Sequence, residues 1–124
     1  MRAYILIAPL LLSASSVAGE AAPAPVQGIA LYSYGYNPEP IVLSAGKAVT
    51  LNFLNRATKG HDFTAKKFFS SSRIISGNVA DGEIDLGPGQ SASVTLVPAA
   101  GRYKVHCGHP FHKMMGMSGD IVVR

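Results

Sequence analysis

The chain has 124 residues, of which 48% are apolar and 15% charged, a balance that suits one folded domain and excludes a multidomain enzyme or a disordered chain. Its formal charge is +4, but the basic residues occur singly or in pairs, of which Lys66 and Lys67 are the densest. Because phosphate binding usually needs a run or stripe of basic residues, nucleic acid is not an expected partner.

Residues 1–18 have the layout of a secretory signal peptide. Arg2 supplies a positive charge, residues 3–12 are almost wholly apolar, and small residues follow as far as Ala18. The apolar stretch covers about 10 residues, whereas a stable transmembrane helix needs about 20, which disfavours an uncleaved membrane anchor. We therefore expect cleavage after Ala18, or after Ala21, export to the periplasm, and no stable membrane insertion after cleavage.

Residues 19–25, rich in Ala and Pro, are expected to form a flexible lead-in to a single domain that spans residues 26–124. Short apolar or alternating runs, separated by Gly, Pro and Asn, are typical of strands in a sandwich or barrel. The expected strands are residues 29–34, 40–44, 48–54, 61–64, 83–86, 91–97, 102–107 and 119–123. A short helix is expected within residues 65–76, packed over one end of the sheets.

Alternation along residues 102–107 places the only cysteine of the chain. Tyr103, Val105 and Cys107 are expected to face the core, while Arg102, Lys104 and His106 face water, so the thiol ends a buried strand face. A lone cysteine in an oxidising compartment would oxidise or cross-link unless it is buried or bound to a metal. This favours a metal ligand, although a buried cysteine that only packs is the alternative.

Donors of sulfur and imidazole nitrogen follow this cysteine. Within eleven residues the chain carries Cys107, His109, His112, Met114, Met115 and Met117. Soft sulfur together with imidazole suits copper, and two histidines, one cysteine and a weak axial methionine form the type 1 electron-transfer arrangement. The loop supplies Cys107, His112 and Met117, and His61 is the upstream candidate for the second imidazole.

Two sequence motifs resemble the cupredoxins, the small blue copper proteins. One is Gly-His-Asp-Phe at residues 60–63, and the other places Cys107, His112, Met117 and Gly119 in a C-x4-H-x4-M-x-G pattern. The resemblance extends more loosely over residues 40–124. It implies an all-β, cupredoxin-like Greek-key β-sandwich, with the short helical segment near residues 65–76.

The resemblance also implies one copper ion that cycles between Cu(I) and Cu(II). By residue, it implies that Cys107 is the thiolate ligand, that His61 and His112 are the imidazole ligands, and that Met117 is the weak axial ligand. Met117 is favoured over the methionines at 114 and 115 because of its spacing to His112 and the glycine that follows.

Other polar residues near the expected site leave alternatives open. His109 is expected near the metal without binding it, or in solvent; the alternatives are a further copper ligand, or a second metal site shared with His106. Asn55 is a candidate for a hydrogen bond that stabilises the loop before His61, although asparagine is also a common turn residue.

The favoured function is an exported electron carrier that is not an enzyme. It would exchange single electrons with redox proteins through transient contact at an apolar patch near His112, formed with Pro110 and Phe111 and with Lys113 at its rim. The alternative is a periplasmic copper-handling protein, for scavenging, delivery or resistance, that uses the extra His and Met donors. A small copper enzyme with an open coordination position is disfavoured, because the chain offers a full set of four ligands.

Overall fold

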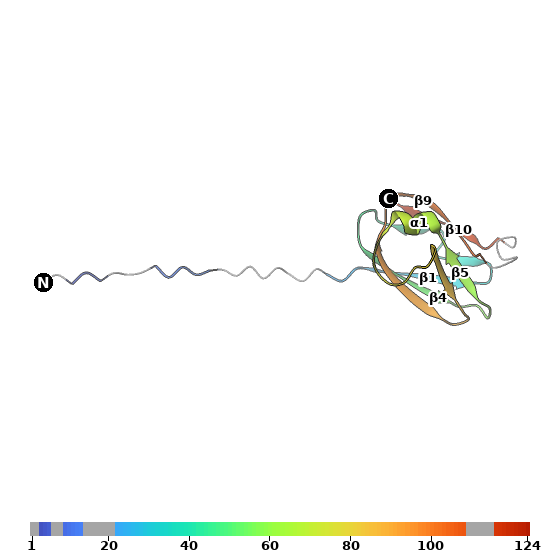
Figure 1. Cartoon of the computed structure of the whole chain (residues 1–124), viewed down its shortest axis with the longest axis horizontal. Helices are drawn as coiled ribbons and strands as arrows, with labels where there is room; N and C mark the ends of the chain where they lie inside the picture. Colours follow the sequence, from blue (N-terminus) through green and yellow to red (C-terminus); the bar gives the residue numbers. More distant parts are fainter. Residues whose placement is uncertain (1–2, 6–8, 14–21, 109–115) are drawn as a thin grey trace.

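The computed structural model describes residues 3–5, 9–13, 22–108 and 116–124, and within them ten strands form two five-stranded sheets (Figure 1). The first sheet has the order β2-β1-β4-β8-β6 and the second the order β3-β10-β9-β5-β7. The first sheet contains β1 (Val26–Tyr32), β2 (Gly35–Asn37), β4 (Val49–Asn55), β6 (Arg73–Ser76) and β8 (Ser91–Val97). The second contains β3 (Ile41–Leu43), β5 (His61–Thr64), β7 (Glu83–Leu86), β9 (Gly101–His106) and β10 (Ser118–Val123).

The core lies between the two sheets, as the alternation of the sequence predicts. In β8, Val94 and Leu96 are buried while Ser91 and Ser93 are exposed. The chain order, with consecutive strands divided between two packed sheets, confirms the all-β Greek-key sandwich.

An aromatic cluster fills the middle of the core. The ring of Phe63 on β5 lies 4.9 Å from that of Phe53, 5.4 Å from that of Tyr36 and 6.0 Å from that of Phe69. Tilted and edge-to-face pairs at these distances add to the stabilisation from apolar burial. Phe63, which faces the core two residues after His61, is therefore held rigidly between the two sheets.

The structure corrects two of the expected elements. The helix α1 spans only Lys66–Ser71, and Ile74, which was expected in a helical segment, lies in the edge strand β6. There it pairs with Leu96 of β8, because pairing with a neighbouring strand overrides the local preference of a short segment. The expected strand 29–34 also divides: β1 ends at Tyr32, and Tyr34 adopts a positive φ of 69° where the chain turns into β2.

The second sheet brings three distant parts of the chain together. β5 lies between β9 and β7, with Thr64 opposite His106 and His61 opposite Leu86. β9 also pairs with β10, with Ser118 opposite His106. Because β5 and β9 are antiparallel, the residues that follow His106 run beside the start of β5, and the start of β10 lies at the same end of the sandwich. No helix among the described residues has the length and apolar character that crossing a membrane requires.

Candidate metal centre

His61 and Cys107 converge at this end of the sandwich. The imidazole Nδ1 of His61 lies 4.0 Å from the Sγ of Cys107, although the two residues are 46 positions apart in the chain. Both side chains are buried, with 1% and 0% of their surface exposed. Metal bonds to nitrogen and sulfur of about 2.0 and 2.3 Å, the values for zinc, would let one ion contact both atoms at this separation.

Met117 lies beside Cys107 because the ladder between β9 and β10 continues past the last paired strand residues. The backbone N–H of Cys107 donates to the carbonyl of Met117 at 3.1 Å, and the Ser118 N–H donates to the carbonyl of Gly116 at 2.8 Å. The side chain of Met117 is fully buried. The backbone of Met117 is thus fixed beside that of Cys107, and both side chains are buried.

Asp62 contributes both its backbone and its side chain to this end of the molecule. Its backbone N–H donates to the Sγ of Cys107 at 3.4 Å. Its carboxylate accepts the Gly108 N–H at 2.8 and 3.0 Å and the Thr64 hydroxyl at 2.7 Å. An N–H aimed at the sulfur favours the charged thiolate, which is the form that binds a metal. The carboxylate fixes the chain just after the cysteine, so one residue orients the sulfur from two sides.

Tyr36 supports the same residue from β2. Its hydroxyl donates to the carbonyl of Asp62 at 2.7 Å. Burial raises the pKa of Tyr36 far above its ordinary value, and the negative charges of Cys107 and Asp62 raise it further. The hydroxyl therefore stays protonated and remains a donor to this carbonyl.

Asn55, the last residue of β4, holds the loop that leads to His61. Its fully buried side-chain amide donates to the carbonyls of Lys59, Leu86 and Gly87 at 2.8, 3.0 and 3.2 Å. Its side-chain oxygen accepts the N–H of Ala57 at 2.9 Å. The predicted loop-stabilising role of Asn55 is confirmed, and it extends to the turn after β7.

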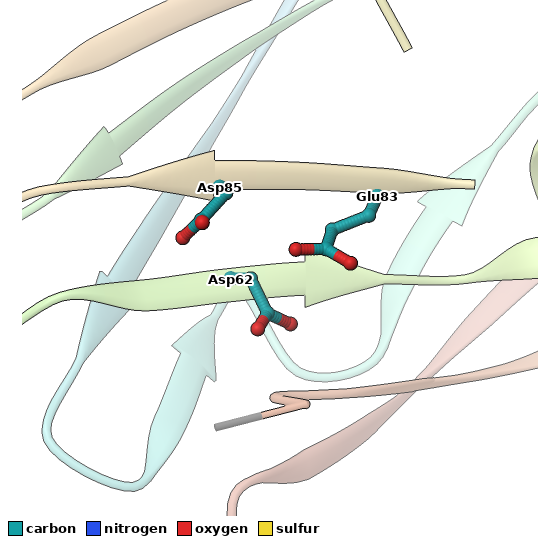
Figure 2. A group of neighbouring side chains, drawn as sticks. All are labelled: Asp62, Glu83 and Asp85. Carbon is teal, nitrogen blue, oxygen red and sulfur yellow. The ribbon is translucent and has the colours of Figure 1, made fainter. Parts of the chain in front are cut away.

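Three carboxylates lie together on the second sheet: Asp62 on β5, and Glu83 and Asp85 on the neighbouring β7 (Figure 2). One oxygen of each lies within 4.8 Å of the others. These are hard oxygen donors, whereas copper prefers sulfur and imidazole. The carboxylate of Asp62 already accepts hydrogen bonds from Gly108 and Thr64, so its position is explained by the ordering of the cysteine segment.

The structure places three of the four predicted ligands. His61, Cys107 and Met117 meet at one end, while His112 lies outside the described residues, as do His109 and the methionines at 114 and 115. The ligand assignment therefore remains a prediction. His106 faces outward and is half-buried, as the alternation of β9 predicts.

Sequence reasoning missed the roles of Asp62, Thr64 and Tyr36. The available signal was a charged residue directly after His61 within an expected strand, because such a residue requires hydrogen-bonding partners if it is buried.

Comparison with known proteins agrees with the donor chemistry. Residues 27–124 match the sequence model of the copper binding proteins, plastocyanin/azurin family. The chain belongs to this family. The match confirms the resemblance to the cupredoxins, and it covers the whole sandwich. No curated protein sequence matches the chain.

Solved structures with the same fold include two auracyanins. The dithionite-reduced auracyanin from Roseiflexus castenholzii is 23% identical, with a TM-score of 0.61, and the match covers 84% of this chain and 99% of that one. Auracyanin A, a "blue" copper protein from Chloroflexus aurantiacus, is 20% identical, with a TM-score of 0.55 and coverage of 80% and 99%. At these identities the likeness shows the fold alone.

A much larger protein contains a similar domain. The multicopper oxidase from Campylobacter jejuni is 14% identical, with a TM-score of 0.63; the match covers 86% of this chain but only 31% of the oxidase. The likeness again concerns the fold, and it extends to less than a third of that protein.

The buried donor set fits the cofactor of the family. The Cys107 thiol and the His61 imidazole nitrogen lie 4.0 Å apart, and the backbone carbonyl of buried Met117 accepts a hydrogen bond from Cys107. These residues offer the sulfur and nitrogen donors that copper prefers. The cofactor of this family member is copper.

Proposed function

We propose that this protein is an exported electron carrier in which His61, Cys107, His112 and Met117 hold the copper ion. The observation that carries the proposal is the 4.0 Å approach of the His61 Nδ1 to the Cys107 Sγ within a buried end of the sandwich. No local feature of the chain brings these residues together, since His61 begins β5 and Cys107 follows the last residue of β9. Bound copper supplies the exchange of single electrons between its two oxidation states.

The protein's own contribution is to hold the donors still. Asp62 fixes the sulfur through its N–H and fixes Gly108 through its carboxylate, while Asn55 holds the loop before His61. Electron exchange is fast when the ligands move little between oxidation states, and hydrogen bonds behind the ligands restrict such movement. The hydrogen bonds of the Asn55 side chain therefore serve electron transfer as well as the stability of the fold.

A carrier is favoured over an enzyme by the number of donors. With four protein ligands no position is left open for a substrate, which a catalytic copper site would need. The multicopper oxidase resembles this chain over only 31% of its own length, so it supplies no argument for oxidase activity here.

Export is supported by the sequence of the first 18 residues, with its basic start, apolar centre and small residues before Ala18. We propose that residues 1–18 are removed and that the domain of residues 26–124 works in the periplasm. Its redox partners would make transient contact near His112. N-terminal sequencing of the protein from a periplasmic extract tests this; an intact N-terminus would contradict it.

The decisive experiment is to load the purified mature protein with copper and record its absorption and electron spin resonance spectra. We expect an intense thiolate-to-copper band towards the red end of the visible and a reversible one-electron reduction. A colourless protein that holds only Cu(I), or one that loses copper to a mild chelator, would instead indicate copper handling.

Histidine variants sharpen the ligand assignment. His61→Ala and His112→Ala should each abolish or strongly shift the band. His106→Ala is the matched control, because its side chain faces outward beside Cys107 and should leave the spectrum unchanged. His109→Ala should also leave it unchanged; a clear shift would assign His109 as a ligand.

A further inference from the structure

A basic groove lies between α1 and β9, at the edge of the second sheet. Its volume is about 360 Å³. The groove is lined by Thr64, Lys66, Lys67, Arg102, Tyr103, Lys104 and His106. Four of these side chains are permanent cations, although the chain as a whole carries a formal charge of only +4.

The positive charge of the groove is only partly neutralised. Arg102 and Lys104 share a single carboxylate, that of Asp120, at 3.9 and 2.7 Å. Within the part of the chain that the structure describes, no carboxylate lies within 4.0 Å of the Lys66 or Lys67 ammonium groups. The four cations and the one carboxylate that pairs with them carry a summed charge of +3.

Folding alone does not account for the two lysines. They occupy the first turn of α1, which contains no acidic residue, and cations in that position oppose the helix dipole. Both are exposed, so they add little to the core. The half-buried ring of Tyr103 also lines the groove between these lysines and β9. Its centroid lies 5.5 Å from that of Phe68. Rigid aromatic rings beside arginine are typical of protein interfaces.

The groove adjoins the proposed metal centre. His106 lines the groove and directly precedes Cys107 in the chain. Thr64, which lies opposite His106, also lines the groove, and its hydroxyl donates to the Asp62 carboxylate at 2.7 Å. Because alternate residues of β9 face opposite sides, His106 faces the groove while Cys107 faces the core. A protein bound in the groove would therefore contact His106, the residue next to the sulfur donor Cys107.

The charges on either side of β5 have opposite signs. The carboxylates of Asp62, Glu83 and Asp85 gather on β5 and β7 (Figure 2), whereas the cations lie on α1 and β9. An acidic surface would be attracted to the groove, and such attraction favours one orientation of a partner as well as a faster rate of encounter.

We propose that the basic groove is a docking surface for the acidic face of a redox protein partner. The proposal rests on the proposed carrier function and adds a second contact surface, formed by other residues than those of the expected apolar patch near His112. It also specifies the partner's chemistry, a surface rich in Asp and Glu.

The first experiment maps the groove without electron transfer. The mature protein in its Cu(I) form is titrated with hexacyanochromate(III), a paramagnetic anion that is not reduced under these conditions, and its amide NMR signals are followed. We expect selective broadening at residues 64–67 and 102–106. Broadening that is uniform, or that centres elsewhere, would overturn the proposal.

A charge-reversed variant and a matched control follow. Lys66→Glu/Lys67→Glu should remove the selective broadening. Lys47→Glu/Arg124→Glu makes the same change in net charge at exposed positions away from the groove and should preserve it. Equal loss in both variants would show an effect of net charge alone. Exposed substitutions of this kind seldom prevent folding.

The second experiment measures docking by an acidic protein. A reduced plant-type [2Fe–2S] ferredoxin transfers one electron to the Cu(II) protein in stopped flow. At an ionic strength of about 0.01 M, we expect the second-order rate constant of Lys66→Glu/Lys67→Glu to be about tenfold below wild type. The control variant should stay within about twofold of wild type, and the difference should shrink as salt is added.

Two further outcomes separate the proposals from one another. Equal rates for all three proteins, with the anion still mapped to the groove, would show a small-anion site and overturn the docking proposal. A wild-type protein that binds no copper or exchanges no electron would overturn the carrier function, while the NMR titration of the copper-free protein would still decide whether the groove binds anions.

Discussion

The two ends of the sandwich are held together by different kinds of contact. At the metal end, where β5 begins and β9 ends, lie the four buried polar side chains of the described residues: Asn55, His61, Asp62 and Thr64. The far end comprises the turns at residues 44–48 and 98–101 and the terminal Arg124. Backbone hydrogen bonds close it, such as Gly46 N–H to the Pro98 carbonyl at 2.9 Å and Arg124 N–H to the Leu43 carbonyl at 3.0 Å.

This difference separates what the fold needs from what the site needs. A buried polar side chain costs free energy unless it is fully hydrogen-bonded, so a sandwich that only had to fold would use backbone bonds and apolar side chains, as the far end does. The polar groups of the metal end are arranged around one thiol and one imidazole. Substitutions at the two ends should therefore differ in effect even where the chemistry removed is the same.

The largest expected effect is that of Cys107→Ala. Removing the thiol should abolish the thiolate-to-copper absorption completely, because no other cysteine exists in the chain to replace it. Absorption spectroscopy of the copper-loaded variant measures this, and circular dichroism checks that the sandwich is retained. Persistence of the band would refute the ligand assignment.

Asn55→Ala should give the largest loss of stability. It removes a buried amide that bonds to Lys59, Leu86 and Gly87 and leaves their carbonyls without this donor, which should cost about 2 to 4 kcal/mol. Urea unfolding of the copper-free protein measures the change. Asn52→Ala, at an exposed position of the same strand, is the control and should cost less than about 0.5 kcal/mol. Equal costs at the two positions would show that the buried hydrogen bonds of Asn55 add no more stability than an exposed side chain.

Two tyrosines provide a direct test between the ends. Tyr36 donates to the Asp62 carbonyl at 2.7 Å at the metal end, and Tyr103 donates to the Ala99 carbonyl at 2.9 Å at the far end. Tyr36→Phe should cost about 1 to 2 kcal/mol because its hydrogen bond is buried, whereas Tyr103→Phe should cost less than about 0.5 kcal/mol because water can replace the hydroxyl. Only Tyr36→Phe should also shift the copper absorption band. The reverse order of stability would contradict the comparison.

The smallest expected effect lies on the outer surface, away from both sets of contacts. The hydrogen bond and charge of Lys104 lower the pKa of Asp120 from its ordinary value, with a further contribution from Arg102. A lowered folded-state pKa contributes stability above the unfolded value of 3.8, and this contribution is lost as the pH falls through the folded-state pKa. Lys104→Met should raise the pKa of Asp120 towards its ordinary value, as measured by NMR titration of its carboxyl carbon. An unchanged titration would show that Lys104 does not hold the carboxylate in solution.

Several elements were predictable from the sequence. The strands at residues 83–86 and 91–97, in which apolar and polar residues alternate, have the bounds expected of them, and so does the fully buried strand at residues 61–64. The segment around Ile74 and Ile75 was wrongly assigned, since two adjacent apolar residues fit a helix or a strand equally well. The edge of β8 decided between them by offering unpaired backbone groups to β6.

The sequence by itself determined the donors: a thiol, imidazoles and thioethers at fixed spacing within one loop, and one histidine far upstream. The spacing of residues along a short loop limits where their side chains can lie. The donors of this loop are therefore predictable from the sequence alone. Tertiary structure alone decided that His61 meets Cys107 at 4.0 Å and that the N–H of Asp62 is directed at the sulfur. Those distances depend on β5 pairing beside β9, and pairing between strands more than forty residues apart is set by the burial of two whole sheet faces.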